Sequence, residues 1–301
     1  MEELLWKHQR RRIPLCPQQK DIRRTQMQIC TTRCGQILLE RTRNRGKCRI
    51  INFLFSSNIM ALYGIFHKGS GLGNSLFRYI ETRVLAMDKQ LGWGMIGKGL
   101  FKGHTFLNLD FGDEPDFPIA IEWPSGRTHI ESDLPRFQED TSDYDWAGIN
   151  GINDGTIIDG EFQGEKYWEH HKDKIDSWLR VEPLDLSDDM CIINFRGGEY
   201  QYVPELFLTL DYWNKAVEMM KKENPNMIFR VVTDDVEMAK LYFPNYEIQH
   251  EIGKDWRSIR FARYLILSNS SFAILPAWLN TNCKLILAPK FWLVILLPFA
   301  L

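Results

Sequence analysis

Four short polar segments carry residue types that could bind an anionic ligand. The first spans residues 69–74, where Gly69, Gly71 and Gly73 alternate with other residues and Asn74 opens a helical pattern. Glycines at such a place let backbone amides approach an anion, and the helix N-terminus adds a favourable partial charge. A tight turn that needs positive φ angles explains the same glycines. The segment has neither the Lys-Ser/Thr of a Walker loop nor the spacing of the dinucleotide fingerprint.

The second segment, residues 194–200, places an arginine at the end of an apolar run. Arg196 is followed by Gly197 and Gly198, and then by Glu199. A guanidinium in this position could donate paired hydrogen bonds to a pyrophosphate. Glu199 could accept a proton or orient the arginine. A surface ion pair in a glycine turn fits these residues equally well.

The third segment contains two adjacent carboxylates, Asp234 and Asp235, after Thr233 and another apolar run. A carboxylate there could hold ribose hydroxyls, or the N1–H and exocyclic amine of guanine. One of the pair is expected to cap the helix predicted from Val236. No third hard ligand is evident nearby, so we expect no metal among the site residues.

The fourth segment, residues 268–272, is rich in hydroxyls. Ser270 and Ser271 precede Phe272. Hydroxyls and free amides at a turn bind phosphate oxygens without a metal. A polar turn with an N-cap role is the alternative interpretation.

Histidines and cysteines suggest no further site. His170 and His171 are adjacent and lack metal-ligand spacing, so we expect them on a solvated helix face. Four of the 6 cysteines lie within residues 1–50, and no pair among them has close C-x₂-C spacing. The rest of the chain keeps Cys191 and Cys283, too few for a disulfide framework, which predicts a reducing cytoplasm.

Alternating apolar runs and amphipathic stretches predict an α/β protein after Met60. The expected strands are residues 61–66, 190–195, 227–232 and 285–288, and the expected helices are 76–85, 167–179, 210–222, 236–242 and 257–267. Residues 92–160 are expected to be loop-rich with short strands, and residues 268–274 to form a strand end and turn. Because such strands form parallel sheets, ligands are expected at their carboxyl ends.

Charge and composition divide the chain into three parts. Residues 1–50 hold 13 lysines and arginines against 4 acidic residues, whereas the remainder is acidic. We therefore expect a basic extension over residues 1–59, which is either a nucleic-acid arm, a disordered extension or upstream sequence outside the working protein. An acidic body argues against general nucleic-acid binding. A linker near residues 181–183 separates an N-terminal α/β domain (60–180) from a C-terminal one (181–301).

Two apolar stretches bear on membrane association. Residues 51–66 are shorter than the roughly 20 residues a span needs, and polar residues interrupt them. A soluble protein is the expectation, and peripheral membrane association through residues 51–66 is the alternative. Residues 293–301 carry no charge, which fits either a buried last element or an altered end.

Taken in order, these segments resemble the glycosyltransferase family that contains the α-1,2-fucosyltransferases. The family motif G-x-L-G-N-Q-x-F-Q-Y is matched by residues 69–79, H-x-R-R-G-D-Y by 194–200, and L-x-x-D-Y-Y-x-x-A by 210–216. Its S-D-D is matched by residues 233–235, N-S-S-F-S-W-W-x-A-W-L-N by 269–280, and I-x-A-P-K-x-W by 286–292. The resemblance covers about residues 60–292.

This resemblance implies a GT-B fold, in which two Rossmann-like domains with mostly parallel sheets face each other across a cleft. The N-terminal domain would hold the acceptor and the C-terminal domain the donor. It also implies an inverting, metal-independent transfer of a sugar from a nucleotide-sugar donor, GDP-fucose or a relative, to a hydroxyl of a glycan or glycolipid. No cofactor is expected. Fixed cations and amides would stabilise the departing nucleoside diphosphate.

The resemblance also assigns roles to individual residues. Arg196 would hold the β-phosphate, and Asp234 or Asp235 would read the guanine. Asn74 would reach across the cleft to the sugar or pyrophosphate. The resemblance does not identify the general base, for which Glu199 is the candidate among these residues, and the expected catalytic residues are Arg196, Glu199 and Asn74. The remaining motif positions expected to contribute to donor binding are Gly71, Gly73, Asn194, Ser270, Ser271 and Phe272.

Several motif positions differ from the family pattern. The family histidine is Asn194, its second arginine is Gly197, and its aspartate is Glu199. Ile274 and Leu275 replace the paired tryptophans of the last motif. These differences leave the transferred sugar open. They also leave an alternative, a catalytically inactive relative that binds a nucleotide or glycan.

Overall fold

The computed structural model describes residues 30–31, 36–37, 61–113, 121–122, 128–129, 134–139, 144–292 and 295–298. It divides into a unit of residues 1–58 with Leu301 and a unit of residues 59–300. Within the first unit, β1 (Cys30–Thr31) and β2 (Gln36–Ile37) pair antiparallel. The other expectations for residues 1–59, and those for the side chains of residues 293–301, lie outside the described residues. Everything that follows concerns the second unit.

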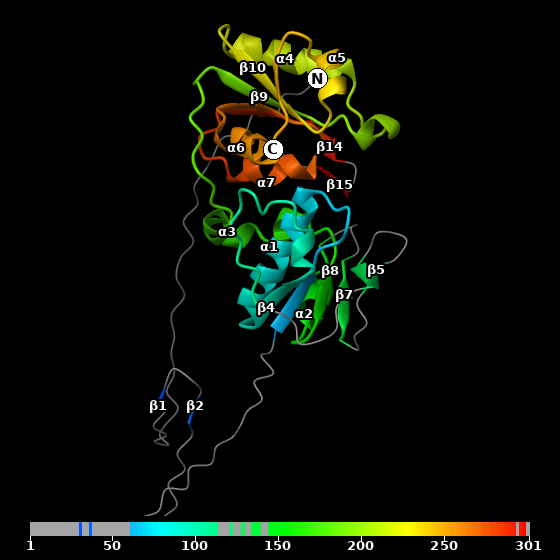
Figure 1. Cartoon of the computed structure of the whole chain (residues 1–301), viewed down its shortest axis with the longest axis vertical. Coiled ribbons are helices and arrows are strands. Elements are labelled where there is room, and N and C mark those ends of the chain that lie inside the picture. Colours follow the sequence, from blue (N-terminus) through cyan, green and yellow to red (C-terminus); the bar gives the residue numbers. More distant parts are fainter. Residues whose placement is uncertain are drawn as a thin grey trace, which may run out of the picture. The chain divides into compact units, whose positions relative to one another are not determined.

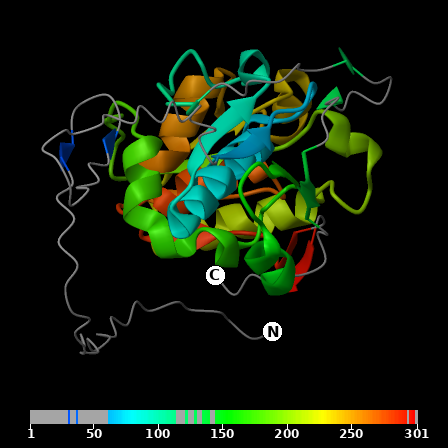
Figure 2. The same ribbon diagram turned by 90° about the horizontal axis from the view of Figure 1, so that it is seen from below.

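The first half of this unit is built on a parallel four-stranded sheet of order β4-β3-β8-β7. Its strands are β3 (Ala61–Ile65), β4 (Gly92–Ile96), β7 (Arg136–Gln138) and β8 (Ile157–Asp159). The long helix α1 (Leu72–Lys89) follows β3 and packs along β3 and β4, as Figure 2 shows. Chain order reverses between β3 and β8, which is where parallel sheets leave a crevice for ligands.

Short elements complete this half. They are η1 (Lys98–Leu100), β5 (Ile121–Glu122), β6 (Thr128–His129), α2 (Trp146–Gly151), η2 (Glu165–Tyr167), η3 (Glu169–His171) and α3 (Lys172–Trp178). The helix expected over residues 167–179 is therefore only partly formed. Its first half consists of two 3₁₀ turns, and Trp168 between them is fully buried with its indole N–H donated to the Phe162 carbonyl.

The second half contains a parallel five-stranded sheet of order β11-β10-β9-β12-β13. The strands are β9 (Met190–Phe195), β10 (Ile228–Thr233), β11 (Glu247–Gln249), β12 (Tyr264–Ile266) and β13 (Leu285–Leu287). All residues of β9 are buried, as expected for a central strand covered on both faces. This order has the 3-2-1-4-5 form of a doubly wound sheet, and chain order reverses between β9 and β12.

Helices and short elements surround this sheet. They are η4 (Glu199–Tyr202), α4 (Leu210–Glu223), α5 (Val236–Tyr242), α6 (Ile252–Phe261), α7 (Ser271–Leu279), β14 (Phe291–Trp292) and β15 (Ile295–Pro298). Figure 1 shows α6 and α7 on the side of this sheet that faces α1, and α4 and α5 on the other side. The amphipathic α4 buries Trp213, Ala216, Val217 and Met220 against the sheet.

Two adjoining predictions in this half are wrong. Residues 257–267 do not form a single helix, because α6 ends at Phe261 and Tyr264 to Ile266 form the buried strand β12. Residues 268–274, expected to be a strand end and turn, instead lead into α7. An apolar run of three residues fits either a strand or a buried helix turn, so periodicity alone does not distinguish them.

The two halves share part of one hydrophobic core. Trp256 of α6 and Leu275 of α7 are buried in the same cluster as Phe77 of α1 and Trp168. The indole of Trp278 packs edge-on against Trp168, with ring centroids 4.7 Å apart. Helices α6 and α7 therefore contribute to the hydrophobic cores of both halves.

The fold class predicted from the sequence is confirmed. The described residues form an α/β structure with two parallel sheets, consistent with two Rossmann-like halves. The boundary placed between residues 180 and 181 stays a prediction. None of the described helices has the length and apolar character needed to span a membrane.

Candidate active site

A cavity of about 330 Å³ lies at the carboxyl ends of both sheets. From the first half it is lined by Gly69, Gly71, Leu72, Gly73 and Lys102, and from the second by Asn194, Phe195, Arg196, Glu199, Tyr200, Val232, Thr233, Asp234, His250, Ile252, Asp255, Ser270, Ser271 and Phe272. Such a volume is typical of a small-ligand site. All four polar segments predicted from the sequence reach this cavity.

The strand order explains why the segments meet. Arg196 follows β9 directly, and Ser270 follows β12, the two strands between which the chain order reverses. Asp234 follows β10 on the other side of β9. Parallel strands end at the same edge of a sheet, so the switch point gathers these side chains around one crevice.

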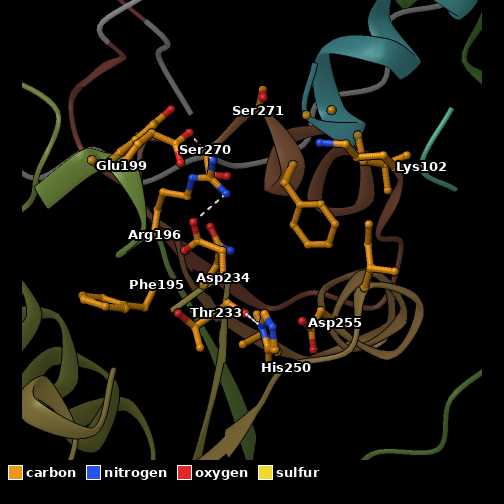
Figure 3. Close-up of a pocket in the computed structure, with 18 of the residues that line it drawn as sticks. Lys102, Phe195, Arg196, Glu199, Thr233, Asp234, His250, Asp255, Ser270 and Ser271 are labelled. Carbon is orange, nitrogen blue, oxygen red and sulfur yellow. Dashed lines mark hydrogen bonds and ion pairs between the residues drawn. The ribbon is translucent and has the colours of Figure 1, made fainter. Parts of the chain in front are cut away.

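Arg196 is held by two carboxylates. Its Nη1 lies 2.8 Å from Asp234 Oδ2, and its Nη2 lies 2.5 Å from Glu199 Oε1. Figure 3 shows the guanidinium between these side chains and close to Ser270. The Arg196 carbon Cζ also lies 5.2 Å from the ring centroid of Tyr200. The side chain is thus oriented before any ligand arrives, which lowers the cost of ordering it.

Asp234 also fixes the turn that carries Arg196. Its Oδ1 accepts the backbone N–H of Gly197 at 2.9 Å. A Cβ at Gly198 would lie 2.3 Å from Asp234 Oδ2, and one at Gly197 would lie 2.8 Å from the Cβ of Asp235. A side chain at Gly197, where the resemblance would place a second arginine, would collide with Asp235, and one at Gly198 would force the Asp234 carboxylate to move.

Two helix N-termini point their first residues at the cavity. Gly71 caps α1 and Ser270 caps α7, and within the described residues neither helix end has a side-chain cap bond. The first-turn amides of a helix have no intrahelical acceptor, and the helix dipole makes this end partly positive. Residues Leu72, Gly73, Ser271 and Phe272 of these first turns line the cavity. The arrangement favours an anion.

Lys102 adds a second cation from the opposite half of the unit. It follows η1, is exposed, and lines the cavity across from Arg196 (Figure 3). Within the part of the chain that the structure describes, its ammonium has no hydrogen-bond or ion-pair partner. It lies near enough to Glu199 to help lower the pKa of that carboxyl.

The far side of the cavity carries a buried carboxyl. Asp255 accepts hydrogen bonds from Gln249 Nε2 at 2.8 Å and from the Glu251 amide at 3.1 Å. Burial raises the pKa of Asp255 to about 6, although these hydrogen bonds and the neighbouring His250 act in the opposite direction. His250 itself donates Nδ1–H to the Thr233 carbonyl at 2.7 Å. This side of the cavity therefore offers hydrogen-bond acceptors.

The environment of Glu199 bears on its predicted role as general base. Burial raises its pKa, but the hydrogen bond from its own backbone amide and the charge of Arg196 outweigh burial, so the pKa is lowered. The side chain is 67% exposed. A general base at neutral pH usually has a raised pKa. These surroundings make Glu199 a weak proton acceptor.

Two predicted site residues do not line the cavity. The Asn74 Oδ1 accepts a hydrogen bond from Gln163 Nε2 at 3.2 Å. Asp235 is the N-cap of α5 and accepts the Met238 amide at 3.0 Å. Capping was one of the two roles considered for the aspartate pair.

Sequence reasoning missed several residues of the cavity wall, and the two that carry a charge are Lys102 and Asp255. Lys102 lies in the glycine-rich region that shows no clear periodicity, and Asp255 lies in a stretch of mixed charge, two residues before the expected helix. Neither belongs to a segment that follows an expected strand. The raised pKa that distinguishes Asp255 from an ordinary surface carboxyl results from burial, so it arises only in the folded chain.

Comparisons with known proteins identify two relatives, although no protein-family model matches the chain. The chain is 26% identical over 266 residues to the alpha-1,2-colitosyltransferase of Escherichia coli, a match covering 74% of this chain and 89% of that protein. It is 24% identical over 170 residues to the O-antigen biosynthesis glycosyltransferase WbnK of Escherichia coli, covering 47% of this chain and 56% of that protein. Both are glycosyltransferases by name. The resemblance predicted from the motifs is thereby confirmed: the chain is similar to curated glycosyltransferases of this kind.

Proposed function

We propose that this protein is a glycosyltransferase that binds a nucleotide-sugar donor in the cavity and transfers the sugar to a hydroxyl of a glycan. The observation that carries the proposal is the convergence of the Arg196 guanidinium with two uncapped helix N-termini, those of α1 and α7. A diphosphate is the part of a nucleotide sugar that such a site would bind. The relationship to two glycosyltransferases supports the same conclusion.

In this proposal the diphosphate lies between Arg196 and Lys102. Arg196 would exchange its bond to the exposed Glu199 for a phosphate oxygen and keep its bond to Asp234. Lys102 would contribute a charge that has no hydrogen-bond or ion-pair partner within the described residues. Because the two cations come from the two halves of the unit, bound diphosphate would link them.

The base of the nucleotide would lie on the side of Asp255. Asp234 is already paired with the Arg196 cation, and Asp235 caps α5 and does not line the cavity. The hydrogen-bond donors to Asp255 among the described residues are neutral, Gln249 and the Glu251 amide. Asp255 is a buried carboxylate in the cavity wall. It could accept the N1–H and the exocyclic amine of guanine, which favours GDP as the nucleotide.

Catalysis would rest on stabilising the leaving group. As the bond between sugar and diphosphate breaks, negative charge grows on the β-phosphate, and prepositioned cations and amides stabilise it. One such contact is typically worth about 3 kcal/mol, or roughly a hundredfold in rate. This chemistry needs no metal, in line with the inverting, metal-independent transfer that the resemblance implies. Fucose, or a closely related deoxy sugar, is the proposed group.

Nucleotide titration tests the proposal. GDP is added to the full chain while its melting temperature is followed, with UDP and CDP in parallel. We expect GDP to raise the melting temperature, and we expect Arg196→Ala to weaken binding by at least about a hundredfold. Arg263→Ala is the matched control, because Arg263 pairs with Asp188 at 2.6 Å outside the cavity.

Turnover separates an active enzyme from a relative that only binds. Protein with GDP-fucose, with and without glycan acceptors, is assayed for release of GDP. Release of GDP that requires Arg196 supports transfer. GDP binding with no release from any GDP-sugar would favour the inactive relative, and the absence of any nucleotide effect on folded protein would contradict the proposal.

A further inference from the structure

Two histidines and an aspartate meet on the surface of the first half, outside the cavity. His170 and His171 close the short η3 turn, and Asp88 lies in the last turn of α1. His171 Nε2 lies 2.7 Å from Asp88 Oδ1, and His170 Nε2 lies 2.8 Å from Asp88 Oδ2. None of the three lines the nucleotide cavity.

The local backbone brings adjacent imidazoles to one side. Residues 169–171 form a 3₁₀ turn, and the two rings lie with centroids 4.6 Å apart. Adjacent side chains point about 100° apart in an α-helix and about 120° apart in a regular 3₁₀ turn, so neither geometry alone brings the rings together. His171 leaves helical geometry, with a φ of −110° and a ψ of 27°, and Asp88, 82 and 83 positions away in the sequence, completes the cluster.

The donor atoms are close enough to share one ion. One ligand atom from each residue lies within 4.8 Å of the others. A tetrahedral zinc ion holds nitrogen and oxygen ligands at about 2.0–2.2 Å, so its ligand atoms are about 3.4 Å apart. The three side chains are 24% to 46% exposed, which leaves them room to close by this amount.

We propose that Asp88, His170 and His171 form a binding site for a transition metal ion such as Zn²⁺. Imidazole nitrogens favour zinc, nickel and copper over magnesium and calcium, which prefer oxygen ligands. Two histidines and one carboxylate leave a fourth position for water. The bound ion replaces the two hydrogen bonds to Asp88 and joins the C-terminal end of α1 to the segment that leads into α3. The site is independent of the proposed transferase activity.

The test uses the untagged full chain, freed of metal with a chelator and titrated with ZnCl₂ in a calorimeter. We expect one Zn²⁺ to bind that is lost, or weakened at least about tenfold, in both His170→Ala and His171→Ala. His104→Ala is the matched control, because His104 is an exposed histidine whose Nε2 contacts the Lys98 carbonyl instead. Parallel titration with Mg²⁺ should give no comparable binding.

A second variant and a spectroscopic measurement separate ligation from folding. Asp88→Asn keeps a side chain that can hydrogen-bond the histidines but removes the anionic ligand, and it should also weaken Zn²⁺. Co²⁺ in place of Zn²⁺ should give the visible absorption of a four- or five-coordinate site in the wild-type chain. Zinc binding that is unchanged in the double variant His170→Ala/His171→Ala, or no binding by the wild-type chain at all, would overturn the proposal.

Discussion

Gly73 of α1 lies against the backbone of Ser271 at the start of α7. A Cβ at Gly73 would stand 2.3 Å from the Ser271 carbonyl carbon and oxygen, and 2.6 Å from the Phe272 amide nitrogen. The two helix N-termini that face the cavity are thus in backbone contact. The glycines of this segment have different roles: Gly69 has a φ of 81° and forms the turn, whereas a Cβ at Gly71 would meet nothing within 4 Å.

This contact predicts that substituting Gly73 impairs stability, whereas substituting Gly71 impairs nucleotide binding. Gly73→Ala should destabilise the protein by about 1–3 kcal/mol, because a methyl group must push two backbones apart. Gly71→Ala should change stability by less than about 1 kcal/mol but should weaken nucleotide binding about tenfold, since its methyl group enters the cavity. Urea unfolding and nucleotide titration of both variants check this. Equal stability losses in the two would contradict it.

Lys102 is predicted to contribute to nucleotide binding only through the phosphate groups. Lys102→Met should weaken GDP binding about fivefold to tenfold and reduce its dependence on salt, because the attraction between this exposed ammonium and the phosphates is screened by salt. Binding of guanosine, which has no phosphate, should not change. Lys215→Met serves as the control, since Lys215 pairs with Asp211 on α4 at 2.6 Å. Equal losses for GDP and guanosine would place Lys102 away from the phosphates.

Glu199 is predicted to compete with the ligand for Arg196. Glu199→Gln removes this negative charge, so GDP should bind several-fold more tightly. Turnover should stay within a few-fold of wild type, because the lowered pKa makes Glu199 a poor proton acceptor. Steady-state kinetics with a GDP-sugar measure both effects. A fall in kcat of a hundredfold or more would restore Glu199 as the general base.

Asp255 is predicted to make stability depend on pH. Its pKa in the folded protein is raised to about 6 from 3.8, so its favourable contribution is complete below about pH 4 and is lost as pH rises through 6. The difference corresponds to about 3 kcal/mol. The stability of Asp255→Asn relative to wild type should therefore increase between pH 4 and pH 7. Urea unfolding across this range measures it, with the exposed Asp211→Asn as reference. A flat difference would show that the carboxyl is not perturbed.

The sequence predicted the parts of the site that follow a strand. Arg196, Asp234 and the glycines at positions 69–73 come directly after apolar runs long enough to be recognised as strands, and the ends of parallel strands meet. Ser270 and Ser271 were identified from their hydroxyls although their strand was assigned as helix. The parallel α/β class followed from the same alternation of apolar and amphipathic stretches.

Site residues that do not follow a recognisable strand could not be predicted from the sequence. Lys102 reaches the cavity from a loop, and its position depends on how one half packs on the other. Asp255 became notable through burial and the hydrogen bond from Gln249, both of which are tertiary properties. The pairing of Asp88 with two histidines joins residues more than 80 positions apart, and no local pattern encodes such a contact.

The apolar cluster shared by α1, α6 and α7 limits how the protein can move. Swinging one sheet away from the other would expose Trp256 and Leu275, and would break the edge-on packing of Trp278 on Trp168. Two domains that meet through a polar interface can hinge freely, whereas the two halves of this protein share a buried apolar cluster next to the ligand site. The cavity should consequently have nearly the same shape with and without bound nucleotide. Its affinity would then depend on how well the preformed cavity fits the nucleotide, and not on closure of one half onto the other.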